Sequence, residues 1–106
     1  MKKIPRPPGH LSAEMKRWWN DFLKTYDLEA SELLLLQAAC VSWDRASAAR
    51  EHIAKIGAVL DDRFGQRKMN PSCGIERDSL ATFTRILRQL MGSDDGYESA
   101  ARLPRI

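Results

Sequence analysis

The sequence predicts a mainly α-helical protein with three principal helices, at about residues 12–26, 29–56 and 71–91, and a small β-hairpin at about 58–69. Apolar residues recur at the three- and four-residue spacing of a helix face in all three helical segments. The segment ends carry residues that cap helices, and a Phe-Gly corner lies between two stretches that tolerate an extended backbone. A chain of 106 residues suffices for one hydrophobic core and is too short for two.

The N-terminal part combines a basic arm with an aromatic helix. Residues 1–10 hold three prolines and a glycine among basic residues, which predicts a flexible arm. Ser12 is a good N-cap for the helix that follows, and Glu14 would face the positive end of its dipole. We expect the apolar face to pack in the core, with a stacking platform for nucleic-acid bases as the alternative. That face consists of Met15, Trp18, Trp19, Phe22 and Tyr26.

The second helical segment is the longest and is rich in alanine. A continuous helix over 29–56 and a helix bent near residues 42–44 both fit its pattern. Such a length exceeds what a small monomer needs, and small side chains let another helix approach closely, which hints at self-association. The apolar stripe consists of Leu35, Leu36, Ala39, Cys40, Trp43, Ala46, Ala49, Ile53 and Ile56.

Glycine and proline mark the remaining boundaries. Gly57 is suited to end the second helix, and Asn70-Pro71 reads as the N-cap and first position of a third helix. That helix would stop at Gly92, which leaves a polar, glycine- and proline-containing tail at 93–106 that we expect to be mobile. The apolar arc of the third helix consists of Ile75, Leu80, Phe83, Ile86, Leu87 and Leu90.

Residues that could carry catalysis are few. No nucleotide-binding loop, nucleophile elbow or zinc-protease signature occurs. Cys40 and Cys73 have no metal-ligand spacing, and Cys73 lacks an evident partner base. Asp61 and Asp62 are adjacent, so in a strand their side chains point to opposite faces. We therefore predict a protein that is not an enzyme, with no catalytic residue, no metal site and no cofactor.

The positive charges point instead to a polyanionic partner. The net charge is +3, and the positive excess lies toward both flanks of a near-neutral middle. Charged turns and charged outer helix faces are common in any soluble protein, so simple solvation is the competing interpretation. The candidate contacts are of the phosphate type, which give affinity rather than sequence choice. They are Arg63, Arg67 and Lys68 on the hairpin, Lys16, Arg17 and Lys24 on the first helix, and Lys2, Lys3 and Arg6 on the arm.

Neither a membrane span nor a secretory signal is evident. The run "LLLL" is bounded by Glu32 and Gln37 and is far shorter than the roughly 20 apolar residues that a bilayer requires. The two N-terminal lysines are not followed by an apolar segment. We expect a cytoplasmic protein without a membrane partner.

The order of these parts, over about residues 10–92, resembles the short class of phage terminase small subunits. The matching features are "LS" at the start of the first helix, the long middle "LLLLQAACVSWDRASAAREHIAKIG", the hairpin "DRFGQRKMNP" and the closing "RILRQLMG". Gly-x-x-x-x-Asn-Pro between two such helices is the most specific of them.

The resemblance implies a single helical domain at 11–92 that assembles into a homo-oligomeric ring. It implies that the ring binds double-stranded phage DNA at the packaging-initiation site and delivers it to the terminase large subunit, which holds the ATPase and nuclease activities. The alternative from the residues alone is a helical interaction or adaptor protein whose basic faces are merely solvated.

Overall fold

The computed structural model describes residues 3–92, and the predicted fold class is confirmed. Three helices, α1 (Ala13–Thr25), α2 (Ala30–Ile56) and α3 (Pro71–Met91), enclose the core. Between α2 and α3 lies an antiparallel hairpin of β1 (Val59–Asp61) and β2 (Arg67–Met69). The predicted tail at 93–106 lies outside the described residues.

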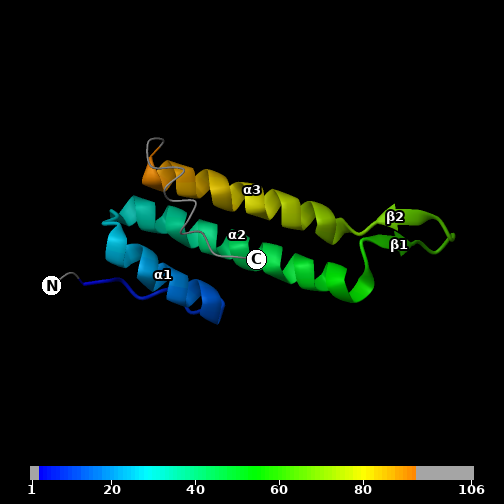
Figure 1. The fold of residues 1–106 in the computed structure, drawn as a ribbon, viewed down its shortest axis with the longest axis horizontal. Helices are drawn as coiled ribbons and strands as arrows, with labels where there is room; N and C mark the ends of the chain where they lie inside the picture. The colour runs from blue at the N-terminus through cyan, green and yellow to red at the C-terminus, as the bar shows by residue number, and fades with distance from the viewer. Residues whose placement is uncertain (1–2, 93–106) are drawn as a thin grey trace.

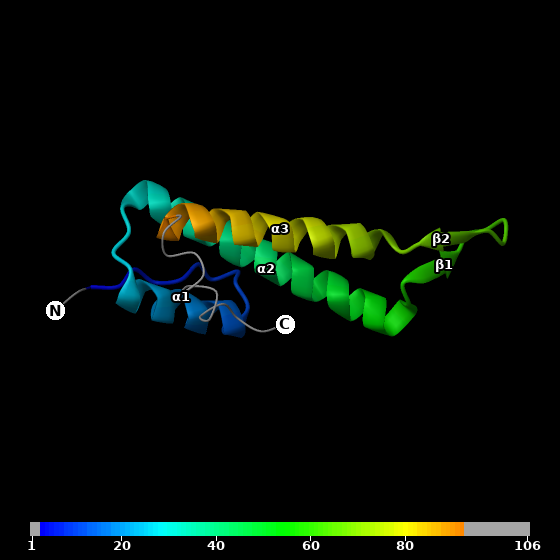
Figure 2. The ribbon, with the colours of Figure 1, turned by 45° about the horizontal axis from the view of Figure 1, so that its top comes forward.

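The helices form an elongated bundle. α2 and α3 lie antiparallel and side by side, and α1 packs against the N-terminal half of α2 (Figures 1 and 2). The hairpin extends past the opposite end of the α2–α3 pair, away from α1 (Figure 1). The principal extents are 61 × 30 × 22 Å. This arrangement leaves the hairpin without a covering helix.

Side chains cap the start of each helix. Ser12 Oγ accepts a hydrogen bond from the Met15 amide at 3.2 Å, as the sequence predicted, and so satisfies a donor that the first turn leaves unpaired. The same serine donates from Oγ and from its backbone N to the Asp44 carboxylate, at 2.6 and 2.8 Å. At the start of α2 the Glu32 carboxylate accepts from the Glu29 amide at 3.0 Å. The Ser12–Asp44 contact thus ties the start of α1 to the middle of α2.

Aromatic rings from all three helices fill the core. Phe83 of α3 is 2% exposed, and its ring centroid lies 5.1 Å from that of Trp43 on α2 and 5.5 Å from that of Trp18 on α1. Tilted pairs at such distances add to the stabilisation from burial alone. Trp19 is buried and Trp18 is partly buried against the same cluster. Core packing is therefore confirmed as the place of both tryptophans.

α2 is continuous from Ala30 to Ile56, without an interruption at residues 42–44. Most of its predicted stripe is buried, but Ile56 is 56% exposed, because the last turn of α2 leads into the hairpin and no helix covers it. Ile75, placed in the α3 core arc from the sequence, is 42% exposed in the part of α3 that α1 does not reach. The predicted burial of these two isoleucines is wrong.

The alanine stripe of α2 is used within the chain. Ala39, Ala46 and Ala49 are buried, and α3 runs alongside the helix (Figures 1 and 2). Small side chains at these positions allow two helices to approach closely. The length of α2 is thus matched by α3 and does not by itself require a second copy of the chain.

The segment predicted to be a flexible arm runs beside α1 without regular secondary structure from residue 3 to residue 8 and turns at residues 9 and 10 (Figure 1). Ile4 packs against the core, and the Trp19 indole Nε1 donates to the Pro5 carbonyl at 3.0 Å. These two contacts hold part of the arm to the bundle. Lys2 lies outside the described residues.

The two thiols should differ in reactivity. Burial raises the pKa of the Cys40 thiol to about 12, and the nearby Asp44 carboxylate adds to the rise. At pH 8 we expect iodoacetamide to modify Cys73, which is partly exposed, and to reach Cys40 only after denaturant is added. Mass spectrometry of peptides from native and denatured samples measures both rates. Equal native rates would contradict the burial of Cys40.

The raised pKa of Cys40 predicts how alkaline pH changes the stability of the protein. An unfolded thiol ionises from about pH 9, whereas native Cys40 stays neutral up to about pH 12. The free energy of unfolding should therefore fall as the pH rises through this interval, and Cys40→Ala should reduce that fall.

Candidate nucleic-acid interface

The hairpin has a defined register and a tight turn. Val59 faces Met69, Leu60 faces Lys68 and Asp61 faces Arg67. One step further, the Asp62 amide donates to the Gln66 carbonyl at 2.8 Å, and the Gly65 amide donates to the Asp62 carbonyl at 3.0 Å. Gly65 has a φ of +78°, the left-handed conformation that a three-residue hairpin loop requires after a type I turn.

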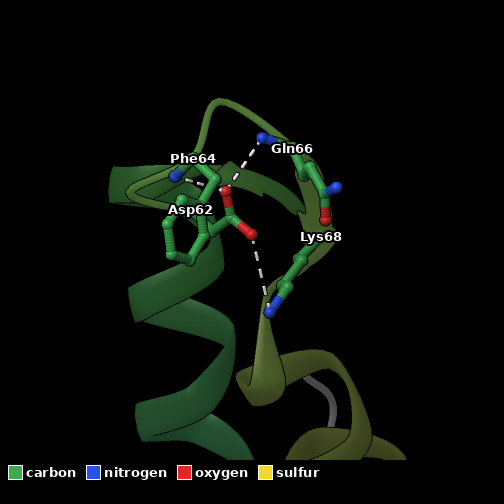
Figure 3. A network of polar contacts seen from close by, with 4 residues as sticks. All are labelled: Asp62, Phe64, Gln66 and Lys68. Carbon is green, nitrogen blue, oxygen red and sulfur yellow. Dashed lines mark hydrogen bonds and ion pairs between the residues drawn. The ribbon is translucent and has the colours of Figure 1, made fainter.

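The Asp62 carboxylate organises this turn. Its Oδ1 accepts from the amides of Phe64 and Gln66, each at 2.8 Å, and its Oδ2 lies 3.6 Å from Lys68 Nζ (Figure 3). The side chain is only 15% exposed. The expectation from the sequence for Asp62, as half of an acidic pair, did not include this role. The sequence does contain a signal for this role, because Asp at the first position and Gly at the fourth position are typical of a type I turn.

Asn70 fixes the base of the hairpin. It is 1% exposed, and its Oδ1 accepts from the Ser72 amide at 3.0 Å, which confirms the predicted N-cap of α3. Its Nδ2 donates to the Gly57 carbonyl at 2.9 Å and lies 3.0 Å from His52 Nδ1. Its backbone amide donates to the Ala58 carbonyl at 2.8 Å. One residue, through its side chain and its backbone amide, thus joins the end of α2, the hairpin and the start of α3.

Three predicted cations share the hairpin. Arg63, Arg67 and Lys68 are all exposed there, beyond the ends of the helices, and we call them the hairpin cations. The Arg63 guanidinium lies 4.9 Å from the centroid of the Phe64 ring, a cation–π distance. The Asp62 carboxylate accepts from two backbone amides and pairs with Lys68, so its negative charge is partly offset within the hairpin.

The other predicted cations lie elsewhere. Arg17 and Lys24 are exposed on α1 and Lys16 is partly buried, and Lys24 Nζ lies 3.7 Å from Asp21. α1 packs on the part of α2 farthest from the hairpin, so the structure does not join these residues to the hairpin cations in one surface (Figure 1). Lys3 and Arg6 are exposed on the arm beside α1.

A groove between α1 and α2 carries the opposite charge. It is lined by Glu14, Asp44 and Glu51 together with His10 and Ser47, and has a volume of about 490 Å³. Glu14 accepts from the Trp43 indole Nε1 at 2.8 Å, and Asp44 holds Ser12. Acidic side chains repel a phosphate backbone, so this face disfavours nucleic acid.

Residues 3–92 bring no set of three or more His, Cys, Asp or Glu side chains into a metal-binding arrangement. Cys73 Sγ lies 3.9 Å from the Ala58 carbonyl, and His52 Nδ1 is directed at Asn70 and at Ser72 Oγ, 3.1 Å away. Within the same residues, none of the helices combines the length and the apolar character needed to span a bilayer.

Comparison of the chain with protein-family models, with curated proteins and with solved structures gave no match.

Removal of the Asn70 side chain should destabilise the junction that it forms. Asn70→Ala removes the cap and leaves the Gly57 carbonyl without its donor, so we expect a loss of about 2 to 3 kcal/mol in the free energy of unfolding. Urea denaturation followed by circular dichroism measures it. Asn70→Asp keeps an oxygen for the cap but loses the amide donor, which separates the two contributions. A loss below about 0.5 kcal/mol for Asn70→Ala would contradict this role.

Proposed function

We propose that the protein is a double-stranded-DNA-binding subunit of the phage terminase small-subunit type, which self-associates into a ring. Its role would be to recognise the packaging-initiation site and to deliver the DNA to the ATPase- and nuclease-bearing large subunit. The observation that carries the proposal is the protruding hairpin, which exposes Arg63 in its turn and Arg67 and Lys68 on β2, while Asp62 and Gly65 keep the turn in one conformation.

Electrostatics supports contact through the hairpin. A cationic two-stranded ribbon that projects from the protein can reach the phosphates on either side of a DNA groove, and the major groove is wide enough to admit it. The acidic groove lies where the start of α1 meets the second half of α2, and the hairpin lies beyond the end of α2. The groove would disfavour a duplex at that face, which leaves the hairpin and the cations of α1 and the arm as the surfaces open to phosphates.

Exposed apolar side chains around the hairpin support self-association. Val59 and Met69 are paired across the strands and are 50% and 69% exposed, and Ile56, just before the hairpin, is 56% exposed. An isolated two-stranded hairpin is marginally stable, and its apolar face gains from being covered. We propose that these three residues contact a neighbouring subunit.

The sequence features that resemble terminase small subunits gain a physical meaning in this fold. In "DRFGQRKMNP" the Asp and Gly form the turn, the basic residues face solvent, and Asn-Pro begins α3. These are the parts that a DNA-contacting hairpin requires. A large-terminase reading frame beside the gene would further support the assignment.

Loss of two hairpin cations should weaken DNA binding and leave the helices folded. Lys68→Ala also removes the ion pair with Asp62, which keeps its hydrogen bonds to the two turn amides. Arg67→Ala combined with Lys68→Ala removes two phosphate contacts, so the slope of log K against log salt should decrease in magnitude by about 1.8. Gel-shift titration over a salt series with packaging-site or phage-end duplex measures it. The control, Arg85→Ala with Arg88→Ala, removes the same charge from exposed positions on α3.

An unchanged slope in the hairpin variant would move the contact surface to Lys16, Arg17 and Lys24. Wild-type protein that binds no duplex at low salt would refute the proposal.

Self-association should depend on the apolar residues beside the strands. We expect light scattering to give a mass of several subunits for the wild type, and a lower mass for Ile56→Asp combined with Met69→Asp, because buried carboxylates oppose the contact. Leu34→Asp, at a residue 68% exposed near the other end of α2, is the matched control. A strict monomer at high wild-type concentration would contradict ring assembly.

The same apolar residues favour a second candidate function, a helical adaptor that binds a protein and no nucleic acid. In that case the hairpin cations are only solvated. The adaptor predicts no salt-dependent DNA binding at any position of the chain, and the gel-shift series distinguishes the two functions.

A further inference from the structure

The hairpin turn carries one large apolar side chain that the proposed phosphate contacts do not use. Phe64 is 75% exposed, although an aromatic ring normally contributes a large buried area. It follows Arg63 and precedes Gly65, and Figure 3 shows its ring beside the Asp62 side chain at the turn. A polar residue would satisfy the turn equally well at this position, so the ring itself requires an explanation.

The surroundings of the ring indicate what it contacts. The Arg63 guanidinium lies 4.9 Å from the ring centroid, and Arg67 and Lys68 are exposed on the adjoining strand. Aromatic rings and guanidinium groups both stack on nucleic-acid bases, and exposed cations bind the flanking phosphates. A partner protein that contacts only the apolar ring of Phe64 would leave the surrounding cations without a role.

The backbone on which Phe64 stands is held before any partner arrives. The Asp62 carboxylate accepts from the Phe64 amide and from the Gln66 amide, each at 2.8 Å, and the Gly65 amide closes the turn at 3.0 Å. A preorganised segment loses less conformational entropy on binding than a loose loop does. Because the backbone of the turn is held in this way, the ring of Phe64 can press against a stiff partner such as a DNA duplex.

We propose that Phe64 inserts partly between adjacent base pairs of duplex DNA and kinks it while the hairpin cations hold the flanking phosphates. Apolar side chains used in this way unstack a base step and bend the duplex. Flexible pyrimidine–purine steps such as TA are kinked at the lowest energy, so the bend is centred on such a step. The inference rests on the proposed DNA-binding function and adds to it a deformation of the DNA.

The test measures bending and binding separately. The probe is a mixed-sequence duplex of about 30 base pairs with one central TA step and a donor and an acceptor dye at its ends. A second duplex carries 2-aminopurine at the same step to report unstacking. Both are titrated with wild type, Phe64→Ala, Phe64→Leu and the control Leu34→Ala, which removes an apolar side chain of similar exposure from α2, far from the hairpin.

Wild type should raise the energy transfer and the 2-aminopurine fluorescence. Phe64→Ala should lose both signals and bind about five- to tenfold more weakly, since stacking contributes on this scale. Its salt slope should equal that of wild type, because no phosphate contact is removed. Phe64→Leu should keep most of the bend and Leu34→Ala all of it. Circular dichroism should show the same helical content throughout, since Phe64 lies outside the core.

Two results would overturn the inference. If Phe64→Ala bends the duplex as wild type does, or if wild type binds without bending or unstacking the DNA, the proposed insertion of Phe64 is refuted. The DNA-binding proposal then still stands. If Phe64→Ala retains the bend but lowers the mass measured by light scattering, the ring contacts another subunit instead. Wild type that binds neither duplex refutes the proposed function itself.

Discussion

The buried Asn70 side chain is the contact on which the hairpin end of this molecule depends. It caps α3, donates to the carbonyl of Gly57 at the end of α2 and lies beside His52. The backbone amide of the same residue donates to the carbonyl of Ala58. A buried amide is costly to leave unpaired, so each of these partners stabilises the others. The result is that α2, the hairpin and α3 meet at one point and the direction of the hairpin is fixed relative to the helices.

The two ends of the bundle are built by different interactions. Near α1, aromatic rings around Phe83 bring three helices into one apolar core. Near the hairpin, only α2 and α3 remain, and polar contacts of Asn70 and Asp62 replace the apolar core. A segment held by hydrogen bonds can expose cations and Phe64 to solvent without loss of structure. The hydrophobic core therefore serves as a support for a surface that is free to bind.

The proposed functions draw on three properties of this surface. The hairpin cations would supply long-range attraction and salt dependence, and Phe64 would supply a local deformation of the duplex. Ile56, Val59 and Met69 are exposed beside them, so a neighbouring subunit that covers these residues would also fix the position of the cations. On this view assembly and DNA binding are coupled through one short hairpin.

The sequence by itself determined the local structure. Local structure depends on contacts between residues that are close along the chain, and the pattern of residue types indicates those contacts. Examples are the caps Ser12 and Asn70, the helix ends at Gly57 and Gly92, and the hairpin between α2 and α3. The sequence also placed the hairpin cations together, because they are close along the chain.

Only the tertiary structure decided what depends on distant neighbours. It left Ile56 and Ile75 exposed although their spacing fits the core, because they lie at the end of α2 and near the start of α3, where α1 does not pack. It covered the alanine stripe with α3 and separated the α1 cations from the hairpin. It joined Asn70 to His52 and Gly57, which are 18 and 13 positions away. Periodicity identifies the apolar face of a helix, whereas the partner of that face depends on where the chain returns in space.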